Sequence, residues 1–109
     1  MDFFVTNSER EGTAYHEFFG GKWDGETFWS DSSLYLPDDI FFSHWDFAAA
    51  IKGVVDSYDP YGETEISAAE WKEIGEMIRD TDSKRLYDEA KEWMDHVFRE
   101  TNCFTILGL

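Results

Sequence analysis

The side chains best suited to chemistry in this sequence are carboxylates and aromatic rings near the middle of the chain. Trp23, Trp29 and Tyr61 lie beside turn-forming residues and acids, where rings can be exposed. Four acids with few basic neighbours surround the third of these rings in sequence: Asp56, Asp59, Glu63 and Glu65. Rings supply contact area and carboxylates supply charge, so this combination suits a positively charged protein surface. We take Trp29 and Tyr61 as the expected anchors.

The chain as a whole is strongly acidic, and the acids are unevenly distributed. The formal net charge is −15 over 109 residues, with 24 Asp and Glu against 9 Lys and Arg. Residues 1–66 hold 14 of the acids, only 3 of the basic residues and 15 of the 20 aromatic side chains. In residues 67–109 many acids lie at helical spacing from Lys or Arg, which predicts local pairing. This charge excludes direct binding of nucleic acid and predicts a basic partner.

Other kinds of site have little support in the sequence. The three histidines lie in no nucleophile motif, and we expect each to be structural: His16, His44 and His96. Residues 56–66 lie between two predicted helices and partly resemble a calcium-binding loop, which has a glycine at its sixth position and a carboxylate ligand at its twelfth. If Gly62 is the sixth residue, the twelfth is Ala68, which has no carboxylate. No Cys/His cluster and no phosphate-binding glycine loop is present. We therefore predict no catalytic residue, no metal and no cofactor.

The length and composition predict a single domain, residues 1–109. The sequence is 42% hydrophobic and 18% aromatic, which is enough for a core and unlike disordered acidic chains. The N-terminus lacks the pattern of a secretory signal, and no apolar stretch is long enough for a membrane helix. A lone cysteine, Cys103, cannot form an intrachain disulfide and favours a reducing compartment. We expect a cytoplasmic protein.

Short aromatic-rich runs separated by turn residues predict strands in the N-terminal part of the chain. These runs are Phe3–Thr6, Tyr15–Phe19, Thr27–Trp29, Leu34–Leu36 and Ile40–Phe42. The segment Lys22–Phe28 is interpreted as a hairpin with Asp24 and Gly25 as its two-residue turn. An uninterrupted apolar run, Cys103–Leu107, predicts a final strand that is central or well covered.

Three helices are predicted between these strands. The first covers residues 43–57, with Ser43 as its N-cap. The second begins at Ser67, which forms a capping box with Glu70, and a third follows with Trp93 in its apolar stripe. The order of several strands, three helices and a last strand predicts an α+β fold, in which the helices pack on one face of a mostly antiparallel sheet.

The segment Tyr58–Ile66, together with the capping box and Trp71 that follow, resembles a segment in small immunity proteins. These are cytosolic antidotes of bacterial contact-dependent and polymorphic toxin systems. The likeness extends to size, acidity and the placement of the segment between two helices, and it covers roughly residues 40–78. The resemblance implies a stoichiometric inhibitor of a cognate toxin, often a nuclease with a basic active-site cleft. It carries over no individual catalytic or binding residue.

Three functions remain open at this point. In the leading hypothesis, an immunity protein blocks a basic toxin through the acids of residues 24–65. In the second, the protein mimics DNA, as anti-restriction proteins do, and occludes several DNA-binding proteins. Such a mimic needs carboxylates spaced like phosphates along an extended surface. In the third, a small enzyme uses a pair of carboxylates in a deep pocket, where their pKa values would be raised.

Overall fold

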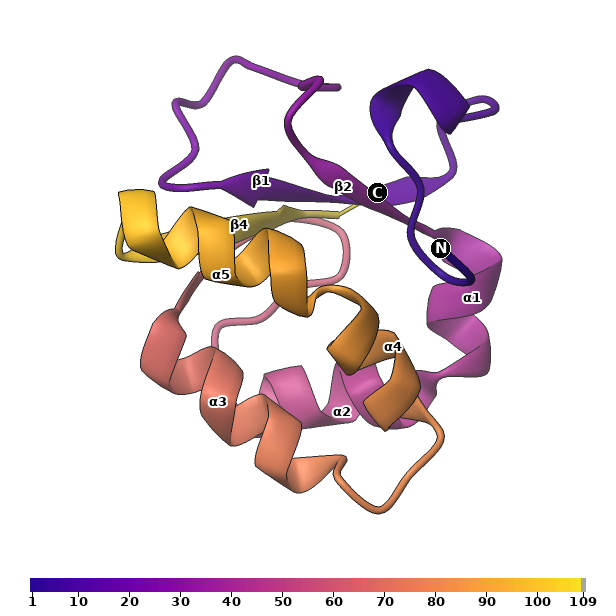
Figure 1. Ribbon diagram of the computed structural model, residues 1–109, viewed down its shortest axis with the longest axis vertical. Helices are drawn as coiled ribbons and strands as arrows, with labels where there is room; N and C mark the ends of the chain where they lie inside the picture. Colours follow the sequence, from indigo (N-terminus) through magenta and orange to yellow (C-terminus); the bar gives the residue numbers. More distant parts are fainter. Residues whose placement is uncertain (109) are drawn as a thin grey trace.

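The computed structural model describes residues 1–108, which form a four-stranded sheet with helices packed against one of its faces (Figure 1). The strands are β1 (Tyr15–Gly20), β2 (Leu34–Pro37), β3 (Glu63–Ser67) and β4 (Cys103–Leu107). Their order in the sheet is β2-β1-β4-β3, and every neighbouring pair is antiparallel. The helices are η1 (Asn7–Glu9, a 3-10 turn), α1 (Asp38–Ser43), α2 (Trp45–Val54), α3 (Ala68–Met77), α4 (Ser83–Glu89) and α5 (Lys91–Glu100). The predicted α+β class is confirmed.

The strand register gives the two faces of the sheet different characters. Side chains alternate along each strand, so Phe18 and its partner Ile106 face the helices, whereas Glu17 and its partner Leu107 face the other way. The inner face carries apolar side chains that continue this row: Leu34, Leu36, Ile66 and Phe104. The outer face is mixed, with Tyr15, Tyr35, Thr105, Glu63 and Glu65. The loop between β1 and β2 lies over this outer face (Figure 1).

Trp71 on α3 occupies the centre of the core. Its ring meets those of Phe18, Phe47 and Phe104 edge-on, with centroids 6.5, 6.0 and 5.3 Å away. It also stacks on Tyr87 at 4.4 Å. Edge-to-face and stacked rings at these separations stabilise a core beyond the area they bury. The prediction that Trp71 is a core residue is confirmed.

Trp93 on α5 lies at the border of the core. Its ring meets Phe104 edge-on at 6.2 Å, and its indole N–H donates to the carbonyl of Ser32 at 2.8 Å. The side chain is half-buried, so the prediction that it lies inside the core is only partly right. The same helix approaches β1 closely at Gly20, where a Cβ atom would meet Val97 at 3.2 Å.

The predicted capping box is confirmed at the start of α3. The hydroxyl of Ser67 accepts the backbone N–H of Glu70 at 3.1 Å, and the Glu70 carboxylate accepts the N–H of Ser67 at 2.8 Å. Ser67 is also the last residue of β3. The chain therefore passes from strand to helix with no intervening loop, and the cap fixes where β3 ends.

The helix predicted over residues 43–57 begins later and ends earlier. Ser43 is the last residue of α1, and its hydroxyl donates to the Ile40 carbonyl at 2.9 Å instead of capping α2. A break at His44, with φ −121° and ψ 53°, separates the two helices. The run Ile40–Phe42 belongs to α1 and is not a strand, because acids in the first turn of α1 favour a helix there. At the other end, α2 ends at Val54, because the backbone of Val55 is extended.

Three expectations about strands are also wrong. The run Phe3–Thr6 contributes only an isolated bridge between Val5 and Tyr35. Residues 27–29 are irregular, and the predicted hairpin of Lys22–Phe28 is absent from the described structure. Conversely, β3 was not predicted, because its glutamates and the preceding turn residues obscure the alternation of its buried side chains.

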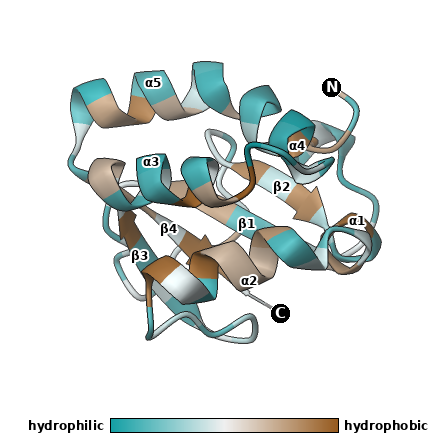
Figure 2. Cartoon of the chain, turned by 90° about the horizontal axis from the view of Figure 1, so that it is seen from below, coloured by the Kyte–Doolittle hydropathy of each residue, from teal (hydrophilic) through white to brown (hydrophobic). Residues whose placement is uncertain are grey.

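The helix predicted after Ser83 is two helices, divided at Ala90. Ala90 is fully buried and carries φ −82° and ψ −5°, which ends α4 and starts α5 in a new direction. In Figure 2, α3 and α5 are largely hydrophilic in colour, whereas α2 is mostly white to brown. Across residues 1–108, no helix combines the length and the apolar character that a membrane crossing requires.

Candidate functional site

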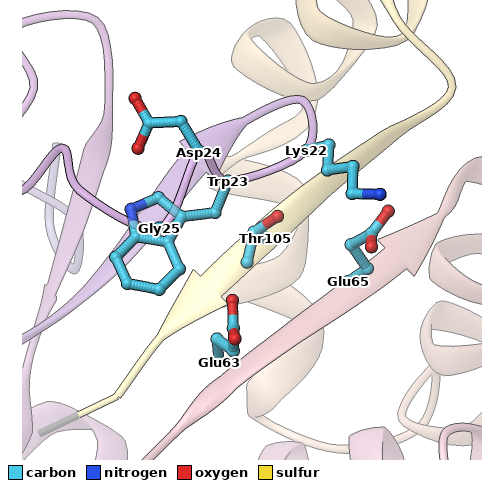
Figure 3. A pocket seen from close by; sticks show the side chains of 7 residues that line it. All are labelled: Lys22, Trp23, Asp24, Gly25, Glu63, Glu65 and Thr105. Carbon is cyan, nitrogen blue, oxygen red and sulfur yellow. The ribbon is translucent and has the colours of Figure 1, made fainter.

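A groove runs along the outer face of the sheet between the β1–β2 loop and the edge strand β3 (Figure 3). It consists of two adjoining hollows of about 370 and 470 Å³ that share Trp23 and Glu63. We call it the outer groove, and its principal side chains are Lys22, Trp23, Asp24, Phe28, Tyr61, Glu63, Glu65, Thr105 and Leu107. In Figure 3, Trp23 lies over the groove from the loop side, and the two glutamates rise from β3.

The loop side of the outer groove is shaped by hydrogen bonds to Asp24. Its carboxylate accepts the backbone N–H groups of Glu26 and Thr27, each at 2.8 Å, and the Thr27 hydroxyl at 2.5 Å. These bonds, those from Thr27 first, lower the pKa of the Asp24 carboxyl to about 2, so it is ionised at neutral pH. The Trp23 indole N–H donates to the Thr27 carbonyl at 2.6 Å, and its ring meets Phe28 edge-on at 5.1 Å. The loop thus closes on itself and presents two rings.

The sheet side of the outer groove is the edge strand β3. Glu63 and Glu65 are exposed and alternate with the buried Thr64 and Ile66, so both carboxylates project from the outer face. Their Cα atoms are about 6.6 Å apart, as expected for alternate residues of a strand. The Cys103 thiol lies 3.4 Å from a carboxylate oxygen of Glu65. Burial, followed by the nearby Glu65, raises the pKa of this thiol, which keeps it protonated and unreactive.

Tyr61 forms one end of the outer groove and is 70% exposed. A tight turn holds it there: the Gly62 N–H donates to the Asp59 carbonyl at 3.1 Å, and the Tyr61 N–H donates to the Asp59 carboxylate at 2.9 Å. The Gly108 N–H donates to the Gly62 carbonyl at 2.8 Å and ties this turn to the end of β4. The fold therefore brings together four residues singled out in the sequence: Trp23, Tyr61, Glu63 and Glu65.

Trp29 does not have the exposure that was expected of an anchor. Its ring is half-buried and stacks on Tyr35 at 5.8 Å. The guanidinium of Arg10 lies over the ring, 3.9 Å from its centroid, and covers it with a cation from the same chain. Trp29 lines a further hollow on the outer face, which adjoins the outer groove and shares Phe28, Leu107 and Gly108 with it. Within the outer groove itself, Trp23 and Phe28 supply the rings beside Tyr61.

Asp56 and Asp59 are separated from the carboxylates of β3. Asp56 is exposed in the loop that follows α2, where its backbone carbonyl accepts a hydrogen bond from the Lys52 ammonium group. It does not line the outer groove. The Asp59 carboxylate is engaged in the turn that holds Tyr61, as described above. Neither acid contributes a free carboxylate to the groove.

Several acids of residues 24–65 that looked unpaired in the sequence have partners in the fold. Asp31 accepts a hydrogen bond from the Asn7 side chain at 2.7 Å, and Asp38 contacts His16 Nε2 at 2.8 Å. Within residues 1–108, the carboxylates with no hydrogen bond or salt bridge in this part of the chain include those of Glu26, Asp56 and Glu63. Fewer carboxylates are therefore unpaired than the sequence suggested. One of them, Glu63 on β3, lies beside the exposed rings of Phe28 and Tyr61.

A serine and a histidine lie close together, but not in a catalytic arrangement. The Ser43 hydroxyl is 3.2 Å from Nδ1 of His44, and both atoms contact the carbonyl oxygen of Ile40. A carbonyl oxygen only accepts hydrogen bonds, so Nδ1 of His44 carries a proton. It therefore cannot take the proton of Ser43 as a general base.

The sequence and the fold were compared with known proteins. No protein-family model, curated protein or solved structure matches this chain. What the outer groove can do follows from its side chains. It can seat long cationic side chains between rings and carboxylates, because Lys and Arg pair with both. Phe28 and Leu107 were missed in the sequence, since only the pairing of β3 with β4 and the closed loop bring them to the groove.

Proposed function

We propose that this protein binds and inhibits a basic protein through the outer groove, as an immunity protein does with its cognate toxin. The observation that carries the proposal is the contact zone formed by Phe28, Tyr61 and Glu63. The two rings are 56% and 70% exposed, and they line the same hollow as a carboxylate that has no partner within residues 1–108. Monomeric proteins rarely leave large rings exposed together without a binding role.

Charge and rings would act at different stages of binding. A net charge of −15 attracts a basic partner from a distance and supports association at up to about 10⁸ M⁻¹s⁻¹ at low salt. After contact, Trp23, Phe28 and Tyr61 would bury apolar area, and Glu63 and Glu65 would pair with Lys or Arg. A nuclease is the favoured partner, because the cleft that binds its nucleic acid is basic.

The outer groove supports a single protein partner better than general DNA mimicry. Double-stranded DNA carries one negative charge per ~1.7 Å of its axis and presents no apolar side chains. In the groove, two carboxylates of β3 stand beside aromatic rings, and Asp24 lies across from them. Protruding rings would obstruct a groove shaped for phosphates, whereas they suit a partner with matching pockets.

The test begins with the gene immediately upstream, which the proposal expects to encode a toxin domain, and measures protection against that domain. Cells would express that domain together with the protein or a variant, and survival and affinity at 50 and 500 mM salt would be measured. We expect Tyr61→Ala and the double variant Glu63→Gln/Glu65→Gln to weaken binding at least tenfold. The matched control is Glu92→Gln/Glu100→Gln on α5, which removes the same charge from exposed positions outside the groove.

Two results would reject the proposal. One is an upstream domain that is not toxic or does not bind. The other is an equal loss of affinity in the groove variant and the α5 control, which would reduce the effect to net charge alone. Inhibition of several unrelated DNA-binding proteins by the unaltered protein would favour the mimic.

A further inference from the structure

A second exposed apolar surface, which shares no lining residue with the outer groove, lies on the solvent side of α2. Phe42 and Trp45 are each 53% exposed, and their rings stack at 5.8 Å with planes only 4° apart. Met77 on α3 is 56% exposed and approaches the backbone of α2 at Gly53, where a Cβ atom would meet its Cε at 3.0 Å. Trp45 lines a groove of about 640 Å³, which we call the α2 groove. Phe42 adjoins this groove through its stack on Trp45, and Met77 adjoins it through its approach to Gly53, which also lines the groove.

The α2 groove is mainly apolar. Small residues of α2 line it, with Trp45, Tyr58 and Pro60 around them: Ala48, Ala49 and Gly53. Lys52 is the basic side chain of the lining, and its ammonium group donates to the backbone carbonyls of Asp56 and Tyr58. Small side chains on a helix allow another helix to approach closely, between ridges of larger side chains. An exposed surface of this kind marks an interaction site more often than an accident of composition.

The backbone of α2 determines what kind of segment can dock there. Its N–H and C=O groups are used within the helix, so it offers no edge to which an extended peptide could add as a strand. A docked segment must satisfy its own backbone hydrogen bonds, and an amphipathic helix does so. Its apolar face would lie on Ala49 and Gly53, with anchors against Trp45 and Met77.

Exposed acids around the α2 groove favour a docked helix that carries basic residues. Asp39 lies one helical turn before Phe42, and Glu73 one turn before Met77. Asp56 follows the end of α2. All three acids are exposed and none forms a salt bridge within residues 1–108. A second copy of this chain would bring another charge of −15, which opposes self-association.

We propose that the α2 groove binds an amphipathic helix whose apolar face is flanked by Lys or Arg, contributed by a basic protein. The site is independent of the outer groove and would exist even if that groove had another role. Hydrophobic contact with Trp45, Ala49 and Met77 supplies the affinity, and Asp39, Glu73 and Asp56 select basic flanks.

The probe is a synthetic 14-residue helix of Leu and Lys with all leucines on one face. A scrambled peptide of the same composition is the control, because it has the same charge and no apolar face. Titrations of isotope-labelled protein at 150 mM salt would be followed by NMR. We expect shifts at Ala48, Ala49, Met77 and the Trp45 indole, and affinity at least tenfold tighter than for the scrambled peptide.

Variants make the assignment specific to the groove. Ala49→Gln fills the groove without changing the charge and should weaken binding of the probe at least tenfold. Ala69→Gln, at an alanine of α3 that is also exposed, should leave it unchanged. Met77→Gln is a second variant at the groove and should also weaken binding of the probe. With two variants, a folding defect in either one cannot by itself decide the outcome. Thermal melts of all three would accompany the titrations.

Four outcomes would overturn the proposal. The scrambled peptide could bind equally well, which would mean unspecific charge attraction. The shifts could fall on the outer groove. The protein could form dimers that Ala49→Gln abolishes, which would make a second copy the occupant. Vesicles of neutral phosphatidylcholine could shift the same resonances, which would make the surface a lipid contact.

Discussion

A carboxylate oxygen of Glu17 accepts the backbone N–H of Trp29 at 2.8 Å, across the outer face of the sheet. The same carboxylate accepts the Ser30 N–H at 3.1 Å and the Ser33 hydroxyl at 2.7 Å, although Glu17 is only 2% exposed. These charge-assisted bonds replace the water that a buried carboxylate loses. They hold the β1–β2 loop in place, including the positive φ of 61° at Trp29.

The first prediction concerns this buried carboxylate. In Glu17→Gln, an amide NH₂ would face groups that donate hydrogen bonds, so donors in the loop would lose a partner. We expect a loss of about 1–3 kcal/mol in the free energy of unfolding, measured in urea. Hydrogen exchange at the Trp29 and Ser30 amides should also become faster. Glu26→Gln is the control in the same loop and should change stability by less than about 0.5 kcal/mol; equal effects would contradict the role given to Glu17.

The second prediction concerns the N-terminal segment, which a carboxylate on α4 holds. Glu89 accepts the backbone N–H groups of Asp2 and Phe3 at 2.9 Å and of Phe4 at 2.8 Å. Glu89→Gln should release this segment, raise exchange at the three amides and lower stability by about 1–2 kcal/mol. Asp88→Asn removes only a surface pair with Lys84 and should cost less than about 1 kcal/mol. Unchanged protection of the Phe4 amide in Glu89→Gln would refute the assignment.

The third prediction is an opposite sign for two glycine substitutions in helices. Replacing a helical glycine by alanine normally stabilises by about 0.5–1 kcal/mol. At Gly75 the new methyl would overlap the Tyr87 ring. This ring is held in place because its hydroxyl donates to the backbone carbonyl of Trp71 at 3.0 Å. Gly75→Ala should therefore destabilise by about 1–2 kcal/mol. Gly53→Ala meets only the flexible end of Met77 and should be neutral or stabilising; a gain at both positions would show that Tyr87 can move.

The fourth prediction concerns pH and His16, which stacks on Phe41 at 4.1 Å. Burial lowers the pKa of His16, and the contact with Asp38 opposes this only in part. Below about pH 6.5 the unfolded chain therefore binds a proton at His16 more readily than the folded protein does. The free energy of unfolding consequently falls as the pH decreases below this value. His16→Gln should show a smaller loss of stability between pH 7.5 and 5.5 than the unaltered protein. His96→Gln, at an exposed site, should keep the full loss; the same slope in both variants would exclude His16 as the source.

Features that depend on neighbouring residues were predictable from the sequence. The capping box at Ser67 needs only a serine and a glutamate three positions apart, and the apolar run of β4 indicates burial by itself. Trp71 lies on an apolar helical face, which also predicts its place in the core. In each case the deciding interaction is local or follows from a strong apolar pattern.

Features that depend on distant contacts were not predictable in this way. The strand β3 exists because residues 63–67 pair with the end of the chain. Trp29 is half-buried because Arg10 and Glu17 hold it, and nothing beside it in the sequence indicates this. For the candidate site, the acids of β3 and the ring of Tyr61 were identifiable. Their alignment with Trp23 required the loop closed by Asp24.

The position of β3 at the border of the sheet has a consequence for solubility. A free strand edge can recruit another chain and seed aggregation, and a short strand with projecting charges resists this. If two copies paired along β3, the glutamates at positions 63 and 65 would approach their counterparts and repel them. That protection depends on the two negative charges, so a variant that removes both would self-associate along β3 where the unaltered protein does not.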